Sequence, residues 1–279
     1  MSNRTAKPLS NLYALAFRNL WTRKTRTFLT ALGIILGVAV ILAINIANNS
    51  TLASINKIFD EASGTADLVI VPSSFTGQGY SQSISNRVRA IDGVQSAVPS
   101  IQASTILAAD AKGWAFNFAL GGSSGNSLLL FGIDPELDTL ARQYKLIAGR
   151  FLNPGERTYS AIFTEEYAVK KHIEVGKDVE ILLPTGTATL RCVGIVRKDG
   201  PGLMNSGVVA FVPLSMVQDL YARQGEIDQI DVVVRTDVGN STEKLAALKH
   251  ALQADLGQKF LVNFPAQRGQ IVSQQLATY

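Results

Sequence analysis

The strongest constraint in this 279-residue sequence is an apolar run near its start. Residues 28–47 read FLTALGIILGVAVILAINIA, carry no charged side chain and include twelve Phe, Leu, Ile or Val residues. A helix of about 20 residues rises about 30 Å, which matches the hydrocarbon thickness of a bilayer. Residues 28–47 are therefore predicted to form a transmembrane helix, and only the segments on either side of it are left to fold in water.

The segment before this run sets the predicted orientation. Every charged side chain that precedes residue 28 is basic: Arg4, Lys7 and the membrane-orienting flank Arg18, Arg23, Lys24 and Arg26. Short segments rich in Lys and Arg stay on the cytoplasmic side of a span. We therefore expect the N-terminus in the cytoplasm and residues 48–279 outside it.

A cleaved signal peptide is the alternative interpretation of the same region. It also combines a basic start with an apolar core, and Thr51, Leu52 and Ala53 supply a small-residue cleavage site. Signal-peptide cores run about 7–15 residues behind a short leader. Here the leader is 1–27 and the core is 28–47, and both are long for a signal peptide, which favours a retained anchor.

The excess of basic residues is confined to the leader, 1–27. Six of the 26 basic side chains lie there, which leaves 20 basic against 22 acidic side chains in the rest of the chain. Nucleic-acid recognition needs a clustered basic face, so the external region is not expected to bind nucleic acid. The basic flank instead fits anionic lipid headgroups, and membrane lipids are predicted partners.

The external region shows no catalytic pattern. The single cysteine, Cys192, lies in an apolar strand pattern and cannot form an internal disulfide. His172 and His250 fall on separate predicted helices without metal-ligand spacing. The glycine-rich stretch 121–126 lacks the GxxxxGK[ST] motif and no helix follows it, so it is predicted to be a hairpin loop. We expect no catalytic, cofactor-binding or metal-binding residues and no cofactor, although a pair of carboxylates of the glycosidase kind stays open.

Two segments next to the span are predicted to be helical. Apolar residues over 12–21 form an amphipathic stretch, which is expected to lie along the inner membrane face as an elbow. After the span, Leu52, Ile55 and Phe59 keep helical spacing. The transmembrane helix is therefore expected to continue outward as a stalk.

A strand–helix–strand unit occurs twice in the external region. Periodicity and turn residues place strand, helix and strand at 67–72, 81–91 and 94–107, and again at 227–234, 241–256 and 260–264. The segment 94–107 reads as one strand or two, since Pro99 marks a bend or an edge. The second helix is expected to have Asn240 as its cap and Glu243 at the third position. Two such units can pair into a ferredoxin-like α/β layer although a long insertion separates them.

The insertion reads as mostly β, with one short helix at 164–173. Its predicted strands, at 114–118, 128–133, 179–183, 187–197 and 207–212, are expected to form a small barrel-like or sandwich body. The predicted fold class is α+β. The predicted boundaries are a cytoplasmic basic elbow 1–27, a transmembrane helix 28–47, a stalk 48–66, a split α/β subdomain 67–111 and 226–266, an inserted mainly-β subdomain 112–225, and the start of a return stalk 267–279.

The predicted span has a face of small residues. Gly33 and Gly37 are one helical turn apart, and Ala39 and Ala43 repeat the four-residue spacing. Small residues let helices approach closely in lipid, so these four residues are predicted to line a helix–helix interface. The partner helix is either in a second copy of the chain or in another span.

The chain resembles the MacB/FtsX-type ABC transporter permeases. The resemblance at the span rests on Asn19-Leu20, Arg23, Arg26-Thr27, Leu29 to Ile34 and Gly37 to Ala39. The external part resembles the MacB-like periplasmic core domain at Gly132 to Pro135, Gly149 to Leu152, Val175 to Val179 and Val193 to Ile195. In that family the split α/β subdomain is called porter and the inserted β-rich one sabre, and the same order occurs here.

The resemblance implies a non-catalytic permease subunit in the bacterial plasma (inner) membrane. A separate cytoplasmic ABC ATPase would hydrolyse ATP, and the permease, as a homodimer or paired with another permease, would move its extracytoplasmic domain for export or envelope remodelling. Envelope proteins are possible further partners. Neither the transported substrate nor the residues that couple to the ATPase can be assigned.

The C-terminal end departs from the four-span plan of such permeases. The chain ends in a polar, helix-like stretch, 267–279, which would lead into a second span, so the sequence is expected to be a fragment or a truncated form. Two other functions stay open: a single-pass anchored extracytoplasmic binding or signalling module, and a secreted hydrolase with an unrecognised site.

Overall fold

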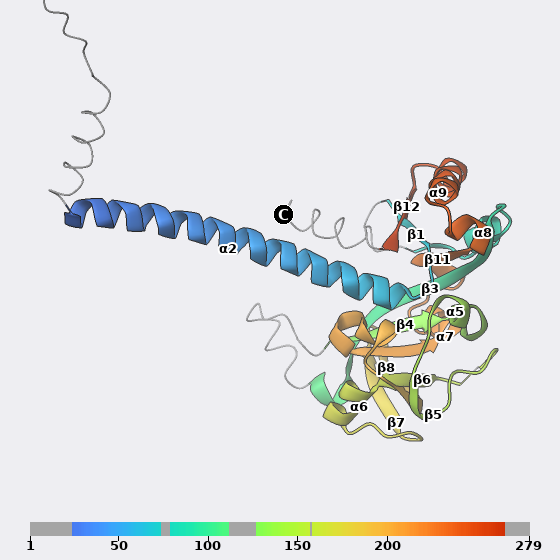
Figure 1. Cartoon of the computed structure of the whole chain (residues 1–279). Coiled ribbons are helices and arrows are strands. Elements are labelled where there is room, and N and C mark those ends of the chain that lie inside the picture. The colour runs from blue at the N-terminus through green and yellow to red at the C-terminus, as the bar shows by residue number, and fades with distance from the viewer. Residues whose placement is uncertain (1–23, 74–78, 112–126, 157, 266–279) are drawn as a thin grey trace, which may run out of the picture. The chain divides into compact units, whose positions relative to one another are not determined.

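The computed structural model describes residues 24–73, 79–111, 127–156 and 158–265 (Figure 1). The chain divides into two compact units, Met1–Ser54 and Ile55–Tyr279. We call the second the external unit, after its predicted side of the membrane. Several predicted features lie outside the described residues: Arg18 and Arg23 with the elbow at 12–21, the strand 114–118, the loop 121–126 and the stretch 267–279.

One long helix, α2, runs from Lys24 to Ser63. Within it, Phe28–Ala47 has a mean hydropathy of 2.6 and no buried residue. It is the one segment of the described residues that is long and apolar enough to cross a bilayer. The helix continues without a break from Ala47 to Ser63, as the spacing of apolar residues predicts.

The two predicted strand–helix–strand units form one α/β layer, as expected. Strand β1 (Leu68–Pro72) pairs antiparallel with both β11 (Gln229–Val234) and β12 (Phe260–Asn263). Strand β11 also pairs with β3 (Val94–Leu107), which gives the order β12-β1-β11-β3. The segments 67–72 and 227–234 thus lie in one sheet, although the first precedes the whole insertion and the second follows it.

Two helices pack beside this layer. Helix α3 (Ser83–Arg89) packs beside β3, and α9 (Thr242–Leu256) packs beside β12. Leu248, Leu252 and Leu256 of α9 are buried, and their four-residue spacing puts them on one face of the helix. The predicted cap of α9 is wrong by one residue: Ser241 is the N-cap, and its hydroxyl accepts a hydrogen bond from the Lys244 N–H at 3.3 Å. Asn240 instead ends the preceding one-turn helix α8 (Thr236–Gly239).

The insertion forms the predicted barrel-like body. Hydrogen-bonded strands close a ring in the order β3-β4-β9-β6-β8-β7-β3. Its members besides β3 are β4 (Leu128–Ile133), β6 (Ser160–Thr164), β7 (Asp178–Leu183), β8 (Gly186–Val196) and β9 (Val209–Pro213). The edge strand β5 (Leu146–Gly149) pairs with β8. Helices α5 (Pro135–Ala141), α6 (Glu165–Lys171) and α7 (Leu214–Leu220) and the turns η1 (Ala108–Asp110) and η2 (Gly200–Gly207) connect these strands.

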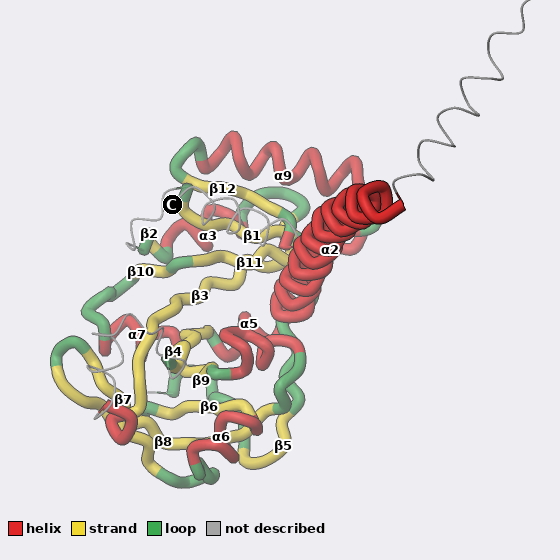
Figure 2. Tube along the Cα trace, turned by 90° about the vertical axis from the view of Figure 1, so that its left-hand side faces the viewer, coloured by secondary structure: helices red, strands yellow, loops and turns green. Residues whose placement is uncertain are grey.

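Strand β3 belongs to both bodies (Figure 2). Its first half, through Ser100, pairs with β11, and its second half pairs with β4 and β7. The sheet is therefore continuous from the α/β layer into the barrel, and one buried cluster includes Leu68 and Val232 of the layer as well as Phe163 and Ile181 of the barrel. Because the strand pairing is continuous and the core is shared, the α/β layer and the barrel form one compact unit. A small separate sheet pairs β2 (Tyr80–Ser81) with β10 (Glu226–Ile227).

Candidate functional site

The candidate site is the junction where the chain leaves α2 and enters the sheet. Gly64 follows the helix with a φ of +64°, a left-handed conformation that glycine adopts at little cost. A Cβ at this position would lie 2.3 Å from the Ala141 carbonyl oxygen, so only glycine fits against that backbone. The junction therefore needs glycine for both its conformation and its close contact.

Thr65 binds the junction to the last turn of α5. Its N–H donates to the Ala141 carbonyl at 2.8 Å, and its hydroxyl donates to the Leu140 carbonyl at 3.0 Å. The last carbonyls of a helix have no partner within the helix. Thr65 supplies hydrogen-bond donors to two of these carbonyls. These bonds attach the end of α5 to the start of the sheet.

Asp67 makes the next attachment. Its carboxylate accepts a hydrogen bond from the Val234 N–H at 2.9 Å, and its own N–H donates to the Val232 carbonyl at 2.9 Å. Both partners belong to β11. The path from α2 into the sheet is thus fixed to α5 on one side and to β11 on the other.

A buried ionic cluster lies next to this junction, because its central residue, Arg142, directly follows Ala141. We call it the Arg142 cluster. The Arg142 guanidinium donates to the carboxylates of Asp138, on α5, and Asp231, on β11, and all three side chains are fully buried. The Tyr144 hydroxyl donates to Asp138, and the Gln229 amide donates to Asp231 at 2.6 Å. The guanidinium also lies 4.9 Å from the centre of the Phe131 ring. The cluster joins α5 to β11 through charged groups that have no access to water.

Burial dominates the electrostatics of the cluster. It raises the pKa of Asp138, and the charge of Arg142 opposes that shift. Burial alone would lower the pKa of Arg142, but the carboxylates of Asp138 and Asp231 raise it above its ordinary value. Burial beside Asp138 also raises the pKa of the Tyr144 hydroxyl. Arg142 stays charged, and removing it would leave two desolvated carboxylates.

Sequence reasoning did not identify this cluster. Two signals for it exist: Asp138 and Arg142 are four residues apart, the spacing of a helical ion pair, and Asp231 interrupts the apolar strand QIDVVV. Neither signal shows that the three side chains meet, because Arg142 and Asp231 are 89 residues apart.

The predicted packing residues lie on an open face of α2. A Cβ added at Gly33 or at Gly37 meets no atom of the described chain within 4 Å, and Ala39 and Ala43 are exposed. In the predicted basic flank, Lys24 begins α2 and Arg26 is exposed. The interface and orienting roles of these residues remain predictions.

The two histidines and the cysteine lie on three different elements, α6, α9 and β8. Among the described residues, no group of three or more His, Cys, Asp or Glu residues could hold a metal ion. His172 ends α6 in a left-handed conformation, and His250 lies on α9. Cys192 is buried in β8, where burial raises the pKa of its thiol. A buried thiol with a raised pKa is a poor nucleophile.

Comparison with known proteins identifies the architecture. The sequence model of the MacB-like periplasmic core domain matches residues 27–251. The periplasmic region of MacB from Actinobacillus actinomycetemcomitans has a similar structure, with a TM-score of 0.52, 20% identity, and coverage of 78% of this chain and 98% of that chain. The extracellular domain of the noncanonic ABC-type transporter YknZ from Gram-positive bacteria matches with a TM-score of 0.48, 14% identity, and coverage of 71% and 98%. No curated protein matches the sequence. Because so few residues are identical, the likeness to the MacB region is one of fold.

Proposed function

This chain belongs to the MacB-like periplasmic core domain family of ABC transporter permeases, and from that premise we propose that it transmits force across the membrane. A separate cytoplasmic ABC ATPase would hydrolyse ATP, and α2 would carry the resulting motion to the extracytoplasmic domain for export or envelope remodelling. The chain itself would have no catalytic role.

The observation that carries the proposal is the unbroken path from the apolar segment into the sheet. Helix α2 continues from Phe28–Ala47 to Ser63 without interruption. The next residues are fixed to α5 and β11 by the hydrogen bonds of Thr65 and Asp67. The Arg142 cluster then joins α5 to β11 within the core. A continuous helix whose end is hydrogen-bonded to α5 and to β11 suits the transmission of bending or torque.

The remaining parts of the proposal come from the sequence. The basic flank places the N-terminus in the cytoplasm, and anionic lipids are its partners there. The open face at Gly33 and Gly37 packs against a second copy of the chain or another permease. The ATPase acts from the cytoplasmic side, since the family works with such ATPases.

The test is a flexible insertion in the stalk of the full-length permease. Six Gly/Ser residues inserted after Leu52, within the segment Thr51–Ser54, would add a flexible linker with an end-to-end distance of about 12–15 Å. We expect the external domain to stay folded, ATP hydrolysis by the partner ATPase to continue, and ATP-dependent export or envelope-remodelling activity to be lost.

The matched control carries the same insertion in the exposed β7–β8 turn, between Pro184 and Thr185. It lengthens the chain equally but lies outside the proposed path, so activity should be kept. Full activity with the stalk insertion would reject force transmission through α2. Activity that does not depend on any ATPase would favour the anchored binding or signalling module instead.

A further inference from the structure

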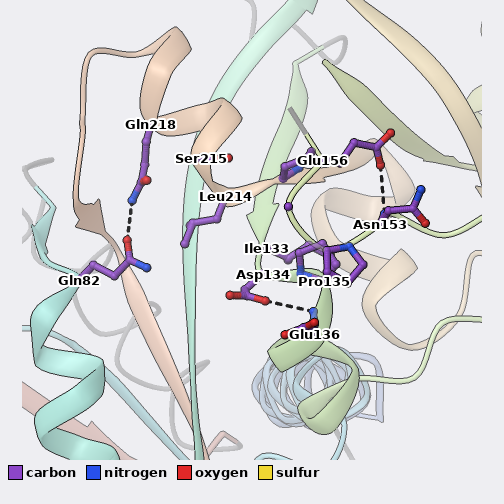
Figure 3. Close-up of a pocket in the computed structure, with 13 residues that line it drawn as sticks. Gln82, Ile133, Asp134, Pro135, Glu136, Asn153, Glu156, Leu214, Ser215 and Gln218 are labelled. Carbon is purple, nitrogen blue, oxygen red and sulfur yellow. Dashed lines mark hydrogen bonds between the residues drawn. The ribbon is translucent and has the colours of Figure 1, made fainter. Parts of the chain in front are cut away.

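A second feature of the external unit lies away from the Arg142 cluster: a cavity of about 380 Å³. Its walls come from the start of α3, the β4–α5 turn, the loop at 153–156 and the β9–α7 turn (Figure 3). Ligand pockets span about 300–1,000 Å³, so this one could hold a small ligand or the end of a chain. Strands β4 and β9 are parallel neighbours, and both end at the cavity. The carboxyl ends of parallel strands are a common position for ligand sites.

One wall presents a pair of side-chain amides. Gln218 is buried, with 8% of its surface exposed. Its Nε2 donates to Gln82 Oε1 at 3.1 Å and to the Glu226 carbonyl at 2.8 Å. Among the described residues, no donor is bonded to Gln218 Oε1, and Gln82 Nε2 is bonded to no acceptor. An acceptor on a buried side chain and a neighbouring donor are therefore available to a ligand.

These two atoms suit the main chain of one peptide residue. Figure 3 draws the Gln218 oxygen and the Gln82 nitrogen on the side of the pair nearer Asp134. Each residue carries one N–H donor and one C=O acceptor, and in an extended chain the two point to the same side. The N–H of the second residue of a bound peptide would donate to Gln218 Oε1, and the C=O of the same residue would accept from Gln82 Nε2.

The opposite wall is acidic. One oxygen of Asp134 accepts from the N–H groups of Glu136 and Leu137, at 3.0 and 3.3 Å, and caps α5. In the described chain its second oxygen accepts no hydrogen bond, and neither does the Glu136 carboxylate. The third acid of the cavity, Glu156, is already paired with Arg150 at 2.6 Å. The lining includes no Lys, Arg or His. This wall therefore favours a positively charged group.

We propose that the cavity binds the amino-terminal end of a peptide, with the ammonium group against Asp134 and Glu136 and the main-chain N–H and C=O of the second residue on Gln218 and Gln82. The amide pair supplies the recognition of the main chain, and the two free carboxylates supply the preference for a charged terminus. This site goes beyond force transmission and does not depend on it, since every residue involved lies in the external unit.

The probes are trialanine amide and its N-acetylated form, which differ only in the ammonium group. Binding to the whole chain in detergent is measured by isothermal titration calorimetry. We expect trialanine amide to bind saturably with a dissociation constant in the millimolar range and the acetylated peptide to bind at least about tenfold more weakly, because a hydrogen bond to a charged group is lost.

Asp134→Asn is the informative variant. Asn is as good a helix cap as Asp, so α5 should keep its start while the charge is lost. We expect affinity for trialanine amide to fall about tenfold and the difference between the two peptides to disappear. Gln82→Ala should weaken both peptides by a similar factor. The matched control is Glu165→Gln, which removes a carboxylate from the first turn of α6, another short helix, and should change nothing.

Three results would overturn the proposal. One is the absence of saturable binding of trialanine amide. Another is equal affinity for the free and acetylated peptides. The third is an equal loss of affinity in Asp134→Asn and Glu165→Gln, which would mean that the peptide responds only to overall charge. Thermal unfolding of each variant shows whether the fold is kept.

Discussion

Replacing Arg142 by Met is the most direct test of the buried attachment behind the junction. Met keeps an unbranched side chain of similar length but removes the guanidinium. The carboxylates of Asp138 and Asp231 would then remain fully buried without the cation that neutralises them. Breaking a buried ion pair by removing one partner costs about 3–5 kcal/mol, because an uncompensated charge is left in the core.

This cost is a large part of the stability of a domain, which is typically about 5–15 kcal/mol. For a domain of about 150–250 residues, 1 kcal/mol lowers the melting temperature by about 2–4 °C, so we expect a decrease of roughly 6–20 °C. The pH dependence should also change. With Arg142 absent, only the Tyr144 hydrogen bond opposes the rise that burial gives the pKa of Asp138, whose unfolded value is about 4. The variant is therefore least destabilised at acid pH and loses stability as pH rises through the raised value.

The assay is thermal unfolding of the whole chain in detergent, followed by near-ultraviolet circular dichroism. The control is Arg87→Met, which removes an exposed Arg paired with Asp255 and should change stability little, because solvent screens exposed ion pairs. Adding Asp138→Asn and Asp231→Asn to Arg142→Met removes the charges and keeps acceptors for Tyr144 and Gln229, so it should restore part of the stability. If Arg142→Met costs no more than Arg87→Met, or if the added Asn residues restore nothing, the reasoning from buried charge is wrong.

Three further predictions concern other positions. Gly64→Ala should destabilise the external unit by at least about 2 kcal/mol in denaturant unfolding, whereas Gly155→Ala, with a similar φ of +67° but open space, should cost only about 1–2 kcal/mol; equal costs would exclude the close contact with Ala141. Hydrogen bonds from Arg150 lower the pKa of Glu156 from 4.5 to about 2, so its stabilisation is present above pH 4.5 and lost toward pH 2; acid unfolding of Glu156→Gln should lack this component. Gly33→Leu with Gly37→Leu should reduce crosslinking between membrane helices, and unchanged crosslinking would make these glycines incidental.

The elements that the sequence determines by itself are those with local periodicity. The apolar run at 28–47 fixes a membrane-length helix, because length and apolarity along one segment are sufficient for it. The buried leucines of α9 and the alternating burial of β7 follow from the same kind of local pattern. Helix ends are specified less sharply, since Asn240 and Ser241 are both good caps and only the backbone conformation shows that Ser241 takes the role.

Only the tertiary structure decides which distant segments meet. The sequence pattern leaves 94–107 open as one strand or two, and the pairing of the two halves of β3 with different partners depends on the register of β11, β4 and β7. Asp231 is visible in the sequence as a charge within an apolar strand, yet its partner lies 89 residues away. Likewise Gly64 is one of 23 glycines until the Ala141 carbonyl is placed 2.3 Å from its missing Cβ. Periodicity indicates which face of a helix or strand is buried. It does not indicate which distant residues come into contact, because those contacts form only when the elements pack together. The junction and the Arg142 cluster both depend on such contacts.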